Sequence, residues 1–215
     1  MNPSATPPRV RPRDNPFRSA CVDALDFVPI DADGGWSAIG RRLHKLGFRG
    51  AVIGPHGHGK TTVLQRLADH VTLPGTARGG RVSPRWIQVR PGDPGRVAEL
   101  RHAVAEHDTL LMVDGYDLLG PVDRWAVRRR RRPVLVTSHG RTLLPTLLQC
   151  RTSPELLGRL IDRLSPTIHG RLDPPQIAAL HRRHRGNLRD AFRELYDRVA
   201  DGEFAEKSLT TASSV

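Results

Sequence analysis

One stretch of this sequence has the residue types and the spacing needed to hold phosphate groups. Residues 54–61 match the pattern G-x-x-x-x-G-K-[ST] at every position. Glycines allow the backbone to wrap around phosphate oxygens with its N–H groups pointing inward, and a following helix adds its dipole. Lys60 would reach the β- and γ-phosphates of a nucleotide, and the Thr61 hydroxyl would bind Mg²⁺. The residues expected to bind the nucleotide are Gly54, Pro55, His56, Gly57, His58, Gly59, Lys60, Thr61 and Thr62.

A carboxylate at the end of an apolar run is the second candidate. Asp114 directly follows the apolar residues 110–113, and a carboxylate in that position can hold Mg²⁺ directly or through water. Many nucleotide hydrolases carry a glutamate next to this aspartate that polarises the attacking water, but here the next residue is Gly115. Asp117 is the nearest acid that could take over that task, and it could equally be an exposed acid at the start of a helix. The residues therefore support nucleotide binding better than efficient hydrolysis.

Hydroxyl and imidazole groups follow a third apolar run. Thr137, Ser138 and His139 stand where the strand predicted at residues 133–138 would end. A polar side chain there can orient water or sense a γ-phosphate by hydrogen bonding, although ordinary strand-end hydroxyls would look the same. The candidate catalytic residues are Lys60, Asp114, Asp117, Ser138, His139 and, from the last helix, Arg189.

The elements that must position these residues alternate along the chain. Short apolar runs predict buried strands, and segments with apolar residues at helical spacing lie between them. This alternation favours an α/β fold with a doubly wound, mostly parallel sheet of the kind found in P-loop nucleotide-binding proteins. The strands are predicted at residues 48–53, 86–89, 110–114, 133–138 and 146–150, with helices near residues 36–46, 62–67 and 97–104.

After residue 152 the pattern changes to helices alone. Capping residues and prolines mark helix starts at Ser153, Asp173 and Asn187, which predicts a small helical lid. The expected domains are a disordered tail at residues 1–14, a P-loop nucleotide-binding domain at residues 15–151, the helical lid at residues 152–204 and a flexible tail at residues 205–215.

The last helix begins with Gly186-Asn187-Leu188-Arg189, and an arginine in a first turn opposes the helix dipole. A phosphate approaching that end would explain Arg189. With this motif the order of elements over residues 36–200 resembles the AAA+ ATPases, especially the clamp-loader and origin-recognition branch. That resemblance implies that Arg189 contacts the γ-phosphate and couples the lid to nucleotide state. It also implies that Asn15-Pro16-Phe17 lines the adenine pocket.

Two features depart from that family. The glutamate after Asp114 is missing, and the stretch at residues 140–145 is very short. Within that stretch only Arg141 could act as an arginine finger toward a neighbouring subunit, and it could equally be a free surface arginine. A nucleotide-dependent homo-oligomer is therefore left open.

The formal net charge of +12 makes DNA a candidate partner, because clustered cations neutralise phosphates. Almost all of the basic residues are arginines, and such a bias also arises from a GC-rich genome. The run Arg128–Arg132 could contact a phosphate backbone or could be a solvated helix end, and it lacks the interleaved aromatics typical of base stacking. The histidine pairs 102/107 and 181/184 lack cysteine or acid partners, which argues against zinc.

Composition limits the location of the protein. No apolar run approaches the roughly 20 residues that span a bilayer, so no membrane partner is expected. The start of the sequence has no signal-peptide core. Cys21 and Cys150 are too few for a disulfide framework, which favours the reducing cytoplasm.

These observations favour an ATP-binding, AAA+-like ATPase that binds Mg²⁺, hydrolyses ATP slowly and uses lid motion to act on a macromolecular partner, DNA or protein. The alternative is a non-hydrolysing switch or adaptor whose binding to DNA or protein depends on ATP. A small-molecule kinase is less favoured, because the lid is C-terminal. No guanine motif N/T-K-x-D and no ABC signature loop is present.

Overall fold

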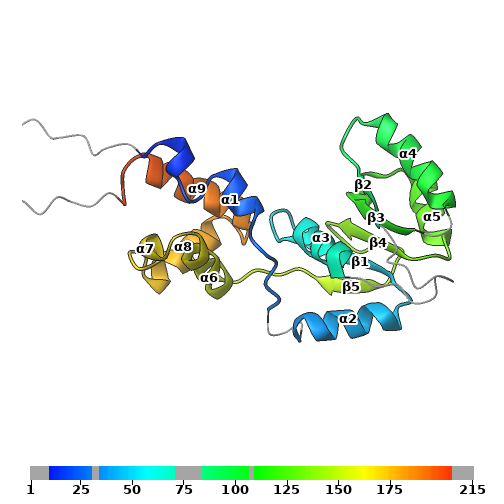
Figure 1. Ribbon diagram of the computed structural model, residues 1–215, viewed down its shortest axis with the longest axis horizontal. Coiled ribbons are helices and arrows are strands. Elements are labelled where there is room, and N and C mark those ends of the chain that lie inside the picture. The colour runs from blue at the N-terminus through cyan, green and yellow to red at the C-terminus, as the bar shows by residue number, and fades with distance from the viewer. Residues whose placement is uncertain (1–9, 31–33, 71–83, 107–108, 205–215) are drawn as a thin grey trace, which may run out of the picture. The chain divides into compact units, whose positions relative to one another are not determined.

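A computed structural model describes residues 10–30, 34–70, 84–106 and 109–204 (Figure 1). The chain divides into two compact units: residues 26–152 form one, and the segments Met1–Leu25 and Ser153–Val215 form the other. We call them the sheet unit and the helical unit. The predictions made for residues 1–9, for His107 and for the C-terminal tail lie outside the described residues.

The described residues of the sheet unit form five strands, and every pairing between them is parallel. Their order across the sheet is β2-β3-β4-β1-β5. The predicted α/β fold with a parallel sheet is therefore confirmed. The strands are β1 (Arg49–Ile53), β2 (Pro84–Gln88), β3 (Leu110–Asp114), β4 (Val134–Ser138) and β5 (Thr146–Gln149).

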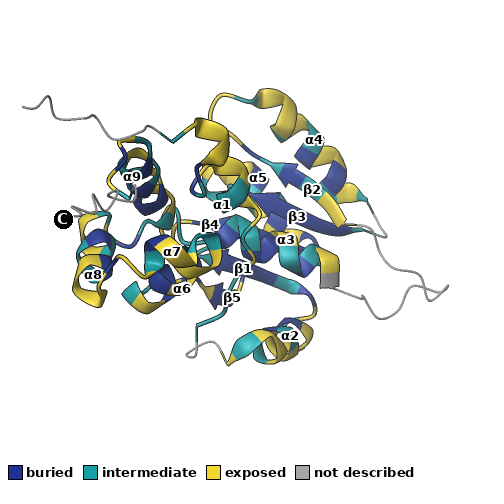
Figure 2. Ribbon diagram, turned by 60° about the vertical axis from the view of Figure 1, so that its left-hand side comes forward, coloured by how far each residue is buried: buried dark blue, intermediate teal, exposed yellow. Residues whose placement is uncertain are grey.

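Both faces of the sheet are covered, which is why its strands appear in the sequence as unbroken apolar runs. In β3, Leu110 and Met112 pack into one hydrophobic cluster, whereas Leu111 and Val113 pack into another. Figure 2 shows the central strands as buried. The first cluster includes side chains of α2 (Gly35–Lys45) and α3 (Lys60–His70), and the second includes side chains of α4 (Pro94–Ala105) and α5 (Pro121–Arg129).

The strand order determines which loops meet. Since β4 lies between β1 and β3, the carboxyl ends of these three strands are neighbours at one edge of the sheet. The glycine-rich loop follows β1, and the 3-10 helix η3 (Tyr116–Leu118) follows Asp114 at the end of β3. Ser138 ends β4 between them.

The helical unit is made from both ends of the chain. Asn15 donates from Nδ2 to the carbonyl of Tyr196 at 2.9 Å, and the rings of Phe17 and Phe192 stack with centroids 6.1 Å apart. Residues 15–25, which the sequence assigned to the nucleotide-binding domain, thus belong to this unit. Its elements are η1 (Pro12–Asp14), α1 (Ser19–Asp23), α6 (Pro154–Leu164), α7 (Pro166–His169), α8 (Pro174–Arg183) and α9 (Leu188–Ala200).

Two sequence expectations differ from this arrangement. Residues 12–14, expected in a disordered tail, form a 3-10 helix with a hydrogen bond from Asn15 N–H to the Pro12 carbonyl. The segment Asn15-Pro16-Phe17, expected at an adenine pocket, belongs to the helical unit, where Phe17 is 3% exposed. No helix in the described parts of the chain is long and apolar enough to cross a bilayer.

Candidate functional site

The glycine-rich loop connects β1 to α3 and depends on its glycines for its shape. Gly57 and Gly59 have φ angles of 69° and 79°, in the left-handed region that favours glycine. A Cβ on Gly54 would lie 2.7 Å from the carbonyl oxygen of Cys150, because this backbone runs close to the end of β5. The loop is therefore fixed in a conformation that side chains at these positions would disrupt.

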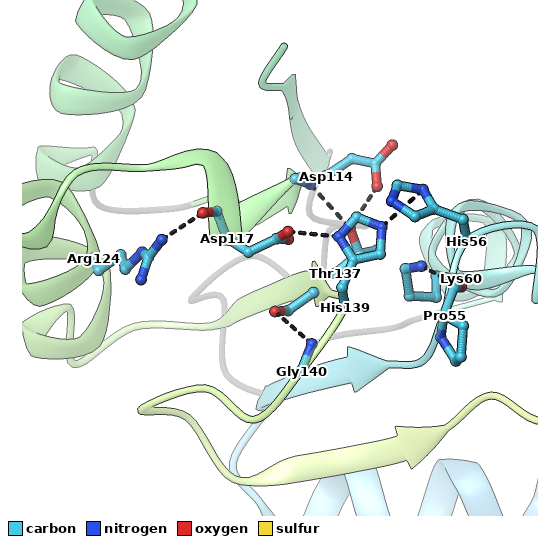
Figure 3. A network of polar contacts seen from close by, with 11 residues as sticks. Pro55, His56, Lys60, Asp114, Asp117, Arg124, Thr137, His139 and Gly140 are labelled. Carbon is cyan, nitrogen blue, oxygen red and sulfur yellow. Dashed lines mark hydrogen bonds and ion pairs between the residues drawn. The ribbon is translucent and has the colours of Figure 1, made fainter. Parts of the chain in front are cut away.

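Lys60 begins α3 and folds back over the loop. Its Nζ donates to the carbonyl of Pro55 at 2.7 Å, and the residue is only 9% exposed (Figure 3). Burial lowers the pKa of Lys60, while the nearby Cys150, Asp117 and Asp114 partly offset that effect. A partly buried ammonium group at the mouth of a glycine loop is suited to an anionic ligand.

Asp114 is held by hydrogen bonds from three different elements. It accepts from Thr61 Oγ1 in α3 at 3.1 Å, from Thr137 Oγ1 in β4 at 2.5 Å and from Gln88 Nε2 in β2 at 3.2 Å. Thr137 Oγ1 in turn accepts from the N–H of Gly115 at 3.0 Å. These contacts fix the carboxylate next to the loop.

Thr61 and Asp114 are the residues that fit a divalent cation. Their oxygens are the hard ligands that Mg²⁺ prefers, and Mg²⁺ usually takes one or two protein ligands and completes its shell with phosphates and water. Within the described ranges no group of three or more His, Cys, Asp or Glu side chains is arranged to hold a metal ion. Thr61 and Asp114 could supply two oxygen ligands to a cation in this position.

A chain of polar groups extends from Asp117 to the glycine loop. Asp117 Oδ2 lies 2.5 Å from His139 Nδ1, and His139 Nε2 lies 3.0 Å from His56 Nδ1 (Figure 3). The two imidazole rings have centroids 3.7 Å apart. We call these residues the Asp117–His139–His56 chain. It joins the ends of three segments that are far apart in sequence.

The charges of this chain influence one another. Burial on its own would raise the pKa of Asp117, but the hydrogen bond from His139 and backbone N–H groups outweigh it and lower that pKa. Burial lowers the pKa of His56, and the charges of His139 and Lys60 act in the same direction. Asp117 is held further by Arg124 of α5, whose guanidinium donates to the Asp117 carbonyl. The environment therefore favours an ionised Asp117 at one end of the chain and a neutral His56 at the other.

The remaining candidate residues are divided between the two units. Ser138 is buried at the end of β4, and its Oγ accepts from the N–H of Gly140 at 3.4 Å. Arg189 belongs to the helical unit, where its side chain is exposed in the first turn of α9 and its N–H donates to Asn187 Oδ1. Arg141 is exposed in the segment after β4. Pro55, His58 and Thr62 lie in or directly after the glycine loop.

Two features of the site were missed from the sequence. Gln88, which donates to Asp114, ends β2, so the reasoning used for the end of β4 would have found it once β2 was known to adjoin β3. The contact between His56 and His139 depends on β4 lying next to β1, which residue spacing does not reveal.

Comparison with known proteins gives no family: no protein-family model matches the chain, and no curated protein matches it. The chemistry of the side chains at the edge of the sheet is therefore what indicates a function.

Proposed function

We propose that the sheet unit binds Mg-ATP at the glycine-rich loop and that the protein is an AAA+-like ATPase with slow turnover. One observation carries this proposal. The Thr61 hydroxyl and the Asp114 carboxylate lie 3.1 Å apart beside a loop that Lys60 covers. A hydroxyl, a carboxylate and a lysine in this arrangement suit a nucleotide phosphate tail with its cation.

The residues would divide the work of binding. The backbone N–H groups of the loop would hold the phosphate oxygens, and Lys60 would exchange its bond to the Pro55 carbonyl for a phosphate contact. Thr61 and Asp114 would hold Mg²⁺, which offsets phosphate charge when bound. Gln88 and Thr137 would keep the Asp114 carboxylate oriented toward that position.

For hydrolysis, we propose His139 as the group that accepts a proton from the attacking water. Asp117 contacts His139 Nδ1, so it would orient the imidazole and stabilise the imidazolium that forms, as carboxylates do beside catalytic histidines. The Nε2 atom that contacts His56 would have to turn toward the water. This requirement is consistent with slow turnover.

A non-hydrolysing, ATP-dependent switch is the second candidate, and the backbone at Gly115 favours it. Gly115 has a φ of 92°, and a Cβ there would lie 2.8 Å from the carbonyl oxygen of Val89. A glutamate at this position would be strained and would collide with the backbone of the segment after β2. The chain is therefore built without the usual water-polarising residue, and His139 is the only replacement we propose.

One set of measurements tests both candidates. Binding of a fluorescent ATP analogue with Mg²⁺ is measured alongside phosphate release for wild type, Lys60→Ala, His139→Ala and the control His102→Ala, an exposed histidine of α4. We expect Lys60→Ala to abolish measurable binding. We expect His139→Ala to keep binding but to reduce turnover by about a hundredfold, which is typical of a lost general base. The control should match wild type.

The possible results separate the hypotheses. Binding without turnover in the wild type would establish the switch and reject the ATPase. Turnover that survives His139→Ala would reject the role of His139. No binding of ATP by the wild type would reject both candidates.

The action of the lid on a DNA or protein partner is a further part of the proposal and derives from the AAA+ resemblance. By that resemblance, Arg189→Ala should reduce turnover with little change in ATP affinity. Arg193→Ala is the matched control, because Arg193 is an exposed arginine one turn later in α9. Equal turnover in both variants would reject the role of Arg189.

A further inference from the structure

The arginine run before β4 does not act as one group. Arg130 is 5% exposed, and its guanidinium donates to the carbonyls of Ala103, Val104 and Glu106 at 2.6–2.9 Å. It also donates to the carbonyl of Thr109 at 2.9 Å. Arg130 therefore binds the carbonyl end of α4 and is part of the fold, whereas Arg128, Arg129 and Arg131 are exposed.

The exposed arginines surround an aromatic ring. Trp125, one turn before Arg129 in α5, is 53% exposed, and the Arg129 guanidinium lies 4.6 Å from the centre of its ring. Trp125, Arg128, Arg129 and Arg131 line a groove of about 390 Å³. Val122, one turn earlier in α5, is 74% exposed. We call the groove lined by Trp125 and the three arginines the Trp125 groove. The sequence analysis found no interleaved aromatics within the arginine run, but the helix brings Trp125 beside it.

The arginines of this groove are not paired with acids in the part of the chain that the structure describes. In the parts of the chain that the structure describes, no carboxylate lies within ion-pair distance of Arg128, Arg129 or Arg131. Two nearby carboxylates are paired with other arginines: Asp123 of α5 with Arg101 at 2.7 Å, and Glu99 of α4 with Arg85 at 2.8 Å. Three cations with no acidic partner among the described residues lie beside an exposed indole ring and suit an anionic ligand.

The combination identifies the class of ligand. Guanidinium groups bind phosphates with directed hydrogen bonds, and exposed tryptophan rings stack on bases that are not already stacked in a duplex. An acidic peptide would use the arginines but would gain little from the flat face of the indole. We infer that the Trp125 groove binds single-stranded nucleic acid, with phosphates on Arg128 and Arg131 and a base on Trp125. This inference does not depend on ATP binding.

Fluorescence anisotropy of a short fluorescein-labelled oligothymidylate tests the inference with the full chain. Arg128→Ala/Arg131→Ala should weaken binding by at least about tenfold at low salt, because two phosphate contacts are lost. It should also reduce the slope of log Kd against log salt by about 1.4, since each contact to a single strand contributes roughly 0.7. The control is Arg41→Ala/Lys45→Ala, which removes the same charge from exposed positions of α2 and should leave Kd within about twofold.

The tryptophan is tested separately from the charge. Trp125→Ala should weaken binding by about tenfold without changing the salt slope, as expected for one lost stacking contact. Trp125→Phe keeps an aromatic ring and should retain most of the affinity, and circular dichroism of every variant verifies that the fold is intact.

Three results would overturn the inference. The first is that the oligonucleotide does not bind while labelled polyglutamate does, which would identify an acidic peptide site. The second is that a duplex of the same length binds as tightly as the single strand and Trp125→Ala has no effect. The third is that the α2 control weakens binding as much as the groove variant, which would show binding by net charge alone.

Discussion

At the scale of single residues, the Asp117–His139–His56 chain is the least expected feature of the sheet unit. An aspartate, a histidine and a loop histidine are joined at 2.5 Å and 3.0 Å. Asp117 Oδ1 is buried and has no hydrogen-bond partner among the described residues, and the carboxylate is stabilised by its contact with His139 and by backbone N–H groups. Ionisation of Asp117 should therefore be linked to the stability of the folded protein.

Asp117→Asn tests that linkage. The pKa of Asp117 is lowered in the fold, so the ionised form adds stability above the ordinary carboxyl pKa of about 4, and this contribution is lost as pH falls through the lower, folded value. We expect wild type to be more stable than Asp117→Asn near neutral pH by less than about 1 kcal/mol, because the pair is partly exposed to solvent. The difference should shrink below about pH 4. Urea denaturation at several pH values measures it.

A stability difference that stays constant down to the acid limit of folding would contradict this linkage. His139→Ala serves as the companion variant, because it removes the hydrogen bond that lowers the Asp117 pKa. In its background, Asp117→Asn should cost less stability than in the wild type.

At the scale of elements, Arg130 links the carbonyl end of α4 to the segments before β3 and β4. Its bonds to Ala103, Val104 and Glu106 supply donors to carbonyls at the end of the helix, where Ala103 also accepts from the N–H of Glu106. Arg130→Ala should lower the free energy of unfolding by about 2–4 kcal/mol, because several buried acceptors lose a charged donor. Urea denaturation measures the loss.

Arg128→Ala is the matched control, since it lies in the same run but is exposed. It should change stability by less than about 0.5 kcal/mol. Equal losses in the two variants would mean that the run acts through its total charge and not through the buried position of Arg130.

The strands were predictable because each buried parallel strand appears as an apolar run. The run ending at Asp114 has the bounds of β3, and the segments predicted at residues 133–138 and 48–53 each begin one residue before β4 and β1. Their order across the sheet was not predictable, because apolar runs carry no information on which strands are neighbours. The glycine loop and Asp114 were identified as candidates from sequence. The hydrogen bonds of Gln88 and Thr137 to the Asp114 carboxylate were not predicted, because they depend on which strands are neighbours.

The arginine run illustrates another limit. Five consecutive arginines look alike in a sequence, yet one is buried because it faces the end of α4 and its neighbours face solvent. Which position is buried depends on where α5 ends relative to α4, and helix ends are set by tertiary contacts. The attachment of residues 15–25 to the helical unit was missed on similar grounds, since it depends on contacts with α9.

At the scale of the whole molecule, the helical unit is discontinuous and the sheet unit is continuous. The described N-terminal residues are fixed to α9 by the stack of Phe17 on Phe192 and by Asn15. Phe17→Ala should destabilise the helical unit by about 3 kcal/mol, the usual cost of removing a buried phenylalanine. If the two units unfold separately, differential scanning calorimetry should show a lower melting temperature only in the transition of the helical unit.

Ser19→Ala, an exposed change two residues further on, is the control and should leave the melting profile unchanged. A Phe17→Ala profile that matches the control would contradict the attachment of the N-terminal segment. A single transition whose melting temperature falls in Phe17→Ala would instead show that both units unfold together.

The split origin of the helical unit also affects how the protein is made. Asn15 is separated from Tyr196 by 181 residues, so the N-terminal segment leaves the ribosome long before the helix that covers Phe17 has been synthesised. At typical translation rates this delay is roughly ten to forty seconds. The continuous sheet unit can fold during that interval, while Phe17 has no native partner and is open to chaperones. Because of the chain order, the sheet unit can be complete before the helical unit has all of its segments.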